Sequence, residues 1–326
     1  MTGGACAFII DAIARNKDLE YFPFQHEQAA AMAADSLWKI DKTVGVTVVT
    51  SGPGATNLIT GIACSYFDSI PTIHITGQVN QNEKEIYKGA SVRQAGFQET
   101  NIVDMVKPIT KYAVQVTNID QLKTELANAY EIALSGRMGP VLIDVPMDVQ
   151  QAEAGDTVLL NKPLSQLISV DEVESIQNSL VKFFEGSKRP LVLFGAGVGL
   201  ADQSDAVLSF IDSNNLPFVS SWNGMNFFNH QHENYYGNIG VYGNRGANFI
   251  LQSADRLLVL GSRLDNRQRG NVKKFAQNAN VLVLDIDHGE LDKHKNNPNH
   301  EMIQIDFYSL HKVMDNLNVQ INSCDS

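Results

Sequence analysis

The segment 44–57 constrains the fold of this 326-residue chain more than any other part of the sequence. A β-rich run, 44–50, leads directly into a Ser-Gly-Pro-Gly turn, 51–54, and then into a helical stretch. A strand followed at once by a helix is the repeating unit of a parallel sheet covered by helices. The turn could be a ligand cradle, because glycines permit close backbone approach and the helix start has free N–H groups, or it could be purely structural. It is not a P-loop, because no Gly-Lys-Ser/Thr follows.

The same alternation of β-rich runs and helical stretches continues along the chain. In the first half the runs are 21–24, 44–50, 72–76 and 141–145, and a clear helical stretch is 122–134. A polar, aperiodic stretch, 150–167, is interpreted as a linker. A helix then begins at Val170, strands are expected at 191–194, 218–221, 256–260, 281–286 and 302–305, and a final helix at 308–317. The pattern predicts the α/β class, with two doubly wound parallel-sheet domains at 1–149 and 168–326.

Composition excludes several functional classes. An apolar share of 44% is that of a globular protein with a full-sized core. The net charge of −11 argues against a nucleic acid as partner, because such binding needs a dense basic surface. No apolar run approaches the roughly 20 residues that cross a membrane, and Met1 is followed by small residues instead of a basic leader. The three cysteines lack CxxC spacing, which favours reduced thiols in a cytoplasmic protein.

Glu27 is the strongest candidate for a catalytic residue. It lies between the apolar run 21–24 and an alanine-rich helical stretch, 29–39. A carboxyl in such a place is suited to share a proton with a ligand nitrogen. The alternative is a glutamate that only stabilises the helix start through the helix dipole. His26 could relay a proton or be structural, whereas His74, in an apolar strand, is expected to be a hydrogen-bonded core histidine.

Around these residues the chain resembles the thiamine-diphosphate (ThDP) enzymes, and most closely the large subunit of acetolactate synthase. The matching segments follow the order of the family along nearly the whole chain: 3–5, 25–28, 50–57, 75–79, 97–100, 135–141, 261–265 and 285–287. Each segment alone is weak support, but the ordered set is strong. The resemblance implies a ThDP pyrimidine-binding domain followed by a Rossmann-like middle domain.

The resemblance also implies a role for each matched residue. Glu27 would contact the aminopyrimidine ring of ThDP and favour the tautomer that activates the cofactor. The positions implied for cofactor binding are Gly4, Ala5, Glu27, Ser51, Gly52, Pro53, Gly54, Asn57 and Gln78. Those implied for substrate contact are Phe97 and Gln98. No metal ligands are implied within this chain, and the charge-rich stretch 285–295 is expected to be a solvated surface.

FAD is an open question at the level of sequence. The positions that match the surroundings of FAD in acetolactate synthases are Arg137, Gly195, Gly197, Gly243, Arg263 and Asp287. Two segments depart from the family pattern: 241–245 replaces its Met-His-Gly, and 264–267 replaces its Phe-Asp-Asp-Arg. These departures weaken the case for FAD, and the Gly-x-Gly-x-Gly spacing at 195–199 differs from the usual dinucleotide pattern.

The implied function is acetolactate-synthase-like decarboxylation and carboligation of 2-keto acids, as in branched-chain amino acid biosynthesis. It would use ThDP and Mg²⁺ in a homodimer or homotetramer. The alternatives are a 2-keto acid decarboxylase, a ThDP lyase of a sugar or polyol pathway, and a non-catalytic dinucleotide-binding or regulatory module. By comparison with the family, an N-terminal strand and helix and the C-terminal domain that binds Mg²⁺ and diphosphate are missing. The 326 residues alone are therefore expected to be inactive and to bind ThDP weakly.

Overall fold

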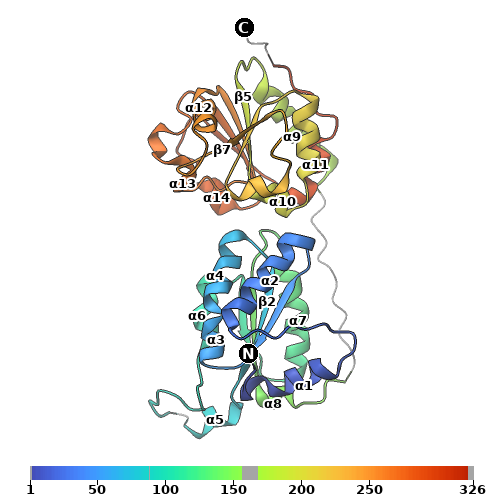
Figure 1. Ribbon diagram of the computed structural model, residues 1–326, viewed down its shortest axis with the longest axis vertical. Helices are drawn as coiled ribbons and strands as arrows, with labels where there is room; N and C mark the ends of the chain where they lie inside the picture. The colour runs from blue at the N-terminus through green and yellow to red at the C-terminus, as the bar shows by residue number, and fades with distance from the viewer. Residues whose placement is uncertain (1, 88, 156–167, 322–326) are drawn as a thin grey trace. The chain divides into compact units, whose positions relative to one another are not determined.

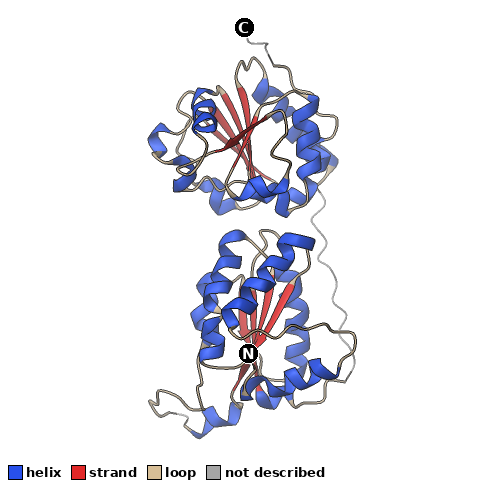
Figure 2. Cartoon of the chain, viewed as in Figure 1, coloured by secondary structure: helices blue, strands red, loops and turns tan. Residues whose placement is uncertain are grey.

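The computed structural model describes residues 2–87, 89–155 and 168–321, and the chain divides into two compact units, 1–163 and 164–326. Each unit is a parallel sheet with helices on both faces (Figures 1 and 2). The predicted α/β class with two parallel-sheet domains is therefore confirmed. Of the predicted linker, 150–167, the part from 156 onward lies outside the described residues.

The first unit has a four-stranded sheet in the order β1-β2-β4-β3, with all neighbours parallel. Its strands are β1 (Gly45–Val49), β2 (Thr72–Gln78), β3 (Tyr112–Gln115) and β4 (Val141–Pro146). Its helices are η1 (Gly4–Cys6), α1 (Ala7–Arg15), α2 (Glu27–Asp41), α3 (Pro53–Asn57), α4 (Ile59–Asp68), α5 (Gln81–Ile86), α6 (Ile102–Val106), η2 (Lys107–Ile109), α7 (Ile119–Leu134) and α8 (Met147–Gln150), where η marks a 3-10 helix. Three predicted strands are confirmed, and β3, which is only half-buried, was not predicted.

The predicted strand at 21–24 is wrong. The backbone there is irregular, and the side chains of Tyr21 and Phe22 are 59% and 71% exposed. Pro23 has no N–H to donate to a sheet, which disfavours strand pairing in so short a run. Glu27 therefore follows an irregular segment, and His26 caps the helix: its Nδ1 accepts the N–H of Gln28 at 3.2 Å.

Both faces of the first sheet are buried. Along β4, Leu142 packs with α2, α4 and α6, whereas Val141 and Ile143 pack with α7. This explains the continuous apolar run that predicted the strand. The alanine-rich sequence of α2 also has a packing reason, because Gly61 of α4 abuts Ala31 so closely that an added Cβ would overlap it. Tight packing of α2 fixes the position of Glu27 at its first turn.

The second unit has a six-stranded sheet in the order β10-β9-β8-β5-β6-β7. Its strands are β5 (Pro190–Phe194), β6 (Phe218–Ser220), β7 (Tyr235–Asn238), β8 (Arg256–Leu260), β9 (Asn280–Asp285) and β10 (His300–Gln304). Read from β7, this is the order 3-2-1-4-5-6 of a Rossmann fold, which confirms the predicted type. Strand β7 was not predicted; it is short and only partly buried.

The helices of the second unit cover the two faces of this sheet. They are α9 (Val170–Phe184), α10 (Ala196–Leu200), α11 (Ser204–Ser213), η3 (Asn223–Phe227), α12 (Arg245–Ser253), α13 (Asn266–Arg269), η4 (Val272–Lys274), α14 (His288–Asp292), η5 (Phe307–Ser309) and α15 (Leu310–Met314). Helices α9, α11 and α15 contribute to one apolar cluster, and α12 and α14 to the other. The predicted helix at 308–317 thus begins as a 3-10 turn and is shorter.

Candidate functional site

Glu27 is buried at the first turn of α2, with 3% of its surface exposed. Its Oε2 accepts a hydrogen bond from Asn57 Nδ2 at 3.0 Å. Among the described residues, Oε1 accepts no hydrogen bond, and a Cβ added at Gly54 would lie 3.4 Å from it. Glu27 and Asn57, 30 positions apart in sequence, are thus brought together with one carboxyl oxygen left for a ligand.

The turn 51–54 links β1 to α3 and forms the wall beside Glu27. Ser51, Gly52 and Gly54 are buried, and Pro53 is exposed at the first position of α3. Gly52 has a φ of +59°, and a Cβ there would meet the Cβ and carbonyl oxygen of Gln98 at 2.8 Å. The turn therefore requires glycine at this position both for its backbone conformation and for space.

The N-terminal turn lies against the same strands. A Cβ at Gly3 would meet Thr50 at 2.6 Å, and Ala5 packs against Gly77 of β2. Ala5 and Cys6 are buried, whereas Gly4 is exposed with open space beside it. Burial raises the pKa of the Cys6 thiol, which donates to the carbonyl oxygen of Gly3 at 3.4 Å. This cysteine is therefore a packed core residue.

Gln78, at the end of β2, is predicted to bind cofactor, but the structure buries it to 2% exposure. Its Nε2 donates to the Thr100 carbonyl at 3.0 Å and to Asp144 Oδ2 at 3.1 Å. Its Oε1 accepts the N–H of Val79 at 3.0 Å. Its polar atoms thus bond to the protein, and a role in cofactor binding stays a prediction.

The two predicted substrate residues lie in the segment just before α6. Phe97 is 83% exposed, and Gln98 is exposed with a φ of +55°. The contact of Gln98 with Gly52 places this segment next to the turn 51–54. The structure thus gathers Glu27, the turn, Asn57 and the segment 97–100 near the carboxyl ends of β1 and β2, the edge of a parallel sheet where ligands bind.

Sequence reasoning missed Asp144, which is 1% exposed on β4. It accepts hydrogen bonds from Thr76 and Gln115 as well as from Gln78. One aspartate in an otherwise apolar strand was the only signal in the sequence.

His74, by contrast, is the core histidine that was predicted: its ring nitrogens lie 2.8 Å from Thr47 Oγ1 and 2.9 Å from Thr72 Oγ1. Burial lowers the pKa of His74 to about 3.

The residues predicted to lie near FAD are divided between the units. Arg137, in the first unit, donates to Ser69 Oγ at 2.9 Å. In the second unit, Gly195 and Gly197 pack against Gly261 where β5 and β8 end, the switch point of the Rossmann order. The N–H groups of Gly195 and Gly197 donate to the carbonyls of Leu260 and Gly261 and are thus engaged within the protein.

The three other residues of that set lie in loops and helix starts of the second unit. The N–H of Gly243 donates to the carbonyl of Gly240 at 3.0 Å. Arg263 lies 4.0 Å from Glu290, and Asp287 caps α14 by accepting the N–H groups of Gly289 and Glu290. The nearby stretch 285–295 is only in part the predicted solvated surface: His288, Lys293 and Lys295 are exposed, but Asp285 and His294 are buried, and His294 Nδ1 lies 2.8 Å from that of His300.

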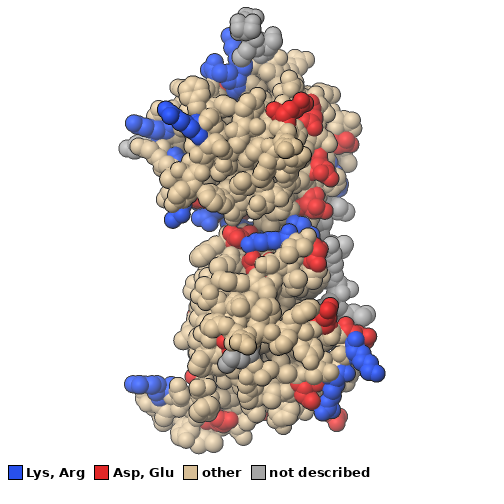
Figure 3. Space-filling model, in the orientation of Figure 1, with Lys and Arg blue, Asp and Glu red and all other residues tan. Residues whose placement is uncertain are grey.

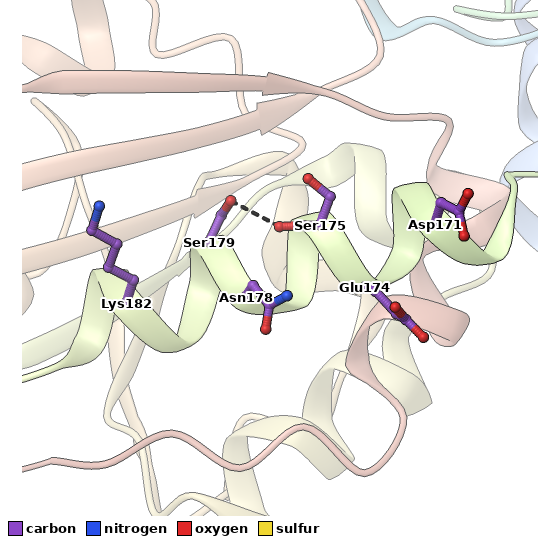
Figure 4. Close-up of a pocket in the computed structure, with 6 residues that line it drawn as sticks. All are labelled: Asp171, Glu174, Ser175, Asn178, Ser179 and Lys182. Atoms are coloured by element: carbon purple, nitrogen blue, oxygen red, sulfur yellow. Dashed lines mark hydrogen bonds between the residues drawn. The ribbon is translucent and has the colours of Figure 1, made fainter.

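A shallow hollow on the second unit lacks the buried, converging polar groups that surround Glu27. It is lined by Asp171, Glu174, Ser175, Asn178, Ser179 and Lys182, which all project from the outer side of α9 (Figure 4). Ser179 Oγ bonds back to the carbonyl of Ser175 at 2.9 Å. Acidic side chains lie along this side of the unit, near α9 and α11 (Figure 3). We interpret the hollow as the solvated face of an amphipathic helix.

Two features are absent from the part of the chain that the structure describes. No group of three or more His, Cys, Asp or Glu side chains is arranged to hold a metal ion within the described ranges. Over those same ranges, no helix has the length and apolar character to cross a membrane.

Two family profiles match the chain. The profile of the thiamine pyrophosphate enzyme N-terminal TPP binding domain matches residues 1–105, and that of the thiamine pyrophosphate enzyme central domain matches residues 178–308.

Acetolactate synthase large subunits are similar over most of this chain. That of isozyme 2 from Escherichia coli K12 is 34% identical over 293 residues, or 89% of this chain and 51% of its own length. That of Lactococcus lactis is 36% identical over 295 residues, or 89% and 49%. A probable large subunit from Methanococcus aeolicus is 33% identical over 302 residues, or 90% and 48%. The chain spans about half the length of these relatives.

Proposed function

Because the chain belongs to the thiamine pyrophosphate enzyme family, we propose that its first unit binds the aminopyrimidine end of ThDP for acetolactate-synthase-like chemistry on 2-keto acids. The observation that carries the proposal is the buried carboxyl of Glu27, whose Oε1 is left without a hydrogen bond among the described residues. A carboxyl that is 3% exposed keeps little contact with water, and a ligand nitrogen at Oε1 would supply the hydrogen bond that the described residues do not make.

The residues around Glu27 fit an aromatic ring with polar edges. A Cβ at Gly54 would come within 2.7 Å of Thr50 and 3.4 Å of Oε1, so a larger residue would crowd this side of the carboxyl, and Asn57 fixes the other carboxyl oxygen. Glu27 Oε1 would hold the proton shared with a ring nitrogen, while the turn 51–54 excludes water from that side. When bound, ThDP supplies the carbon nucleophile and the electron sink that decarboxylation of a 2-keto acid needs. The protein contributes orientation and the position of this proton.

The proposal includes Mg²⁺ as the counter-ion of the diphosphate. We also propose that the natural assembly contains at least two copies of the chain. The segments 52–67 and 97–105 carry four exposed, large apolar side chains, Tyr66, Phe67, Phe97 and Met105, at 39, 60, 83 and 52% exposure. Such a surface favours an interface, and two-fold dimers are the commonest assemblies. Light scattering on the natural protein, that is, the whole product of its gene, tests whether such an assembly forms. A strict monomer at tens of micromolar would reject the proposed assembly.

A second ligand, FAD or another dinucleotide, is favoured by one observation only. The strand order of the second unit creates a switch point between β5 and β8, where such ligands bind. The engaged N–H groups of Gly195 and Gly197 count against a phosphate at this turn. Flavin absorbance in the protein as purified decides between these observations.

The experiment that tests the proposed function is product analysis. The natural protein is incubated with pyruvate, ThDP and Mg²⁺, with and without a second 2-keto acid. Acetolactate as the main product supports the proposal. Acetaldehyde without carboligation supports a decarboxylase, and turnover of only hydroxylated sugar or polyol substrates supports a lyase. Absence of turnover together with absence of ThDP binding supports a non-catalytic module and contradicts the proposal.

A further inference from the structure

A buried polar network occupies the carboxyl ends of three strands in the first unit. Asp144 on β4 is in register with Thr76 on β2 and Gln115 on β3. Its Oδ1 accepts from Thr76 Oγ1 at 2.6 Å, and its Oδ2 accepts from Gln115 Nε2 at 2.6 Å and from Gln78 Nε2 at 3.1 Å. With 1% of its surface exposed, this carboxylate depends on such donors, because a buried charge without them is strongly destabilising.

Asp144 also determines which way the amide of Gln78 faces. Gln78 Nε2 points to two acceptors, Asp144 Oδ2 and the Thr100 carbonyl, while its Oε1 accepts the N–H of Val79. The reversed amide would place Oε1 against a carboxylate and a carbonyl, which have no proton to donate. The carboxylate therefore presents an N–H of Gln78 to Thr100.

The segment 95–100 is held at several points. Glu99 Oε2 accepts the N–H groups of Ala95 and Gly96 at 2.9 and 3.3 Å, which closes the segment on itself. Gln98 touches Gly52, and the Thr100 carbonyl accepts the N–H of Ile102 at 2.9 Å at the start of α6. The bond from Gln78 Nε2 to that carbonyl joins the segment to the interior of the sheet.

We propose that Gln78, oriented by Asp144, is a positioning residue that holds Phe97 and Gln98 beside the turn 51–54. Gln78 acts through Thr100 and does not touch the cofactor. That Phe97 and Gln98 are positioned for a substrate rests on the proposed function. The link that Gln78 makes between the sheet and the segment 95–100 does not depend on that function. Sequence reasoning assigned Gln78 to the cofactor because of its place in a matched segment, and its hydrogen bonds give it a different role.

Hydrogen–deuterium exchange of the 326-residue chain tests the link without any ligand. Gln78→Met keeps the length of the side chain but removes its amide. Gln115→Met is the matched control, because it removes an amide donor from the same oxygen of Asp144 on the other neighbouring strand. We expect the amides of 95–102 to exchange about 2- to 12-fold faster in Gln78→Met, the equivalent of one net hydrogen bond. We expect no such local change in Gln115→Met, although both variants unfold more easily.

Equal loop exchange in the two variants, or no change in either, overturns the link. Should Gln78→Met fail to fold, Gln78→Asn keeps an amide but is too short to span Asp144 and Thr100, and the same local acceleration of hydrogen exchange is expected.

In the turnover assay of the natural protein, Gln78→Met should raise KM for the 2-keto acid several-fold while ThDP affinity stays unchanged. Weakened ThDP binding with an unchanged KM would instead make Gln78 a cofactor ligand and overturn the proposal. A chain that shows the exchange response but never binds ThDP contradicts the proposed function and not the link.

Discussion

In the first unit several buried positions of the sheet carry polar side chains among apolar ones, whereas in the second unit the central strands are apolar on both faces. Strand β2 alone buries Thr72, His74, Thr76 and Gln78. The equivalent central strands of the second unit, β5 and β8, bury valine, leucine, phenylalanine and proline, and the one polar residue, Arg256, is half-buried.

This difference in buried residues shows that the two units use the same parallel-sheet architecture for different purposes. Buried polar groups are tolerated only when their hydrogen bonds are made, and a fully bonded network fixes a single geometry. In the first unit the network of Asp144 lies at the strand ends near Glu27, the turn 51–54 and the segment 95–100. The bonds of His74 with Thr47 and Thr72 lie toward the amino end of β2. In the second unit apolar packing provides stability, and the polar residues buried within its strands, Ser220 and Asp285, are the last residues of β6 and β9. The polar strand ends of the first sheet therefore belong to the candidate site, and the apolar sheet of the second unit is scaffold.

The largest expected effect is the loss of apolar packing in the second unit. Phe218 is fully buried, and its ring lies 5.1 Å from that of Phe228 and 5.2 Å from that of Tyr235. We expect Phe218→Ala to lower the free energy of unfolding of the second unit by about 3–5 kcal/mol through the cavity it leaves. Denaturant unfolding is followed by the two tryptophans, Trp38 in the first unit and Trp222 in the second. An equal loss in the Trp38 transition would show that the units do not unfold independently.

The next effect is a pH dependence in the first unit. Burial lowers the pKa of His74 to about 3 in the folded state, against an unfolded value of about 6.5. Between these values the unfolded chain binds more protons, so stability is complete above pH 6.5 and falls as the pH is lowered towards 3. The loss between pH 7.5 and pH 4 is expected to be about 3 kcal/mol.

His74→Gln should flatten this dependence in the Trp38 transition. The matched control is His288→Gln, because the side chain of His288 on α14 is 70% exposed. Acid sensitivity of the second unit, where burial lowers the pKa of His294 to about 4, should persist in both variants. A Trp38 transition that keeps its full pH dependence in His74→Gln would show that His74 is not the responsible group.

Alanine substitutions at two glycines should have a smaller effect, and comparing them separates the cost of a crowded side chain from the cost of a strained backbone. Gly52 and Gly186 both have positive φ, +59° and +72°, but only Gly52 has a close neighbour, Gln98, whereas no atom lies within 4 Å of a Cβ at Gly186. Each alanine variant is expected to cost about 1–3 kcal/mol for the backbone conformation. Gly52→Ala should lie at the upper end and also increase hydrogen exchange at 95–100. Equal costs without a change in that exchange would mean that the turn and the segment are not in contact in solution.

The smallest effect compares one helix cap in each unit. Ser169 caps α9 in a reciprocal capping box with Glu172, and Asn118 caps α7 through the N–H of Gln121. We expect Ser169→Ala and Asn118→Ala each to cost about 1 kcal/mol, and each only in its own unit. Thermal unfolding with separate tryptophan reporters measures this. A cap variant that destabilises the other unit instead would contradict the division of the chain at 163/164.

Much of this architecture could be predicted from sequence because strands such as β4, β5 and β8 are buried on both faces and form nearly continuous apolar runs. Strands β3 and β7 escaped because they are short and half-buried. The run 21–24 was misread as a strand because its aromatic residues favour strands, whereas Pro23 and the absence of packing over its exposed side chains disfavour one.

In the site, the motif around Glu27 identified the carboxyl that proves to be buried. The bonds of Gln78 could not be foreseen, because Asp144 lies 66 positions away and only folding brings them together.

The most direct test of the account is the exchange of the thiazolium C2 proton of ThDP bound to the natural protein, measured by ¹H NMR after rapid quenching. If Glu27 Oε1 holds the proton shared with the pyrimidine ring, Glu27→Gln should slow this exchange by about 10²–10⁴-fold, the usual contribution of acid–base assistance. Asn57→Ala, which leaves the carboxyl in place but removes its partner at 3.0 Å, should slow it less. The circular dichroism of both variants should match the unmodified protein. An unchanged exchange rate in a folded, ThDP-bound Glu27→Gln variant would contradict the central claim.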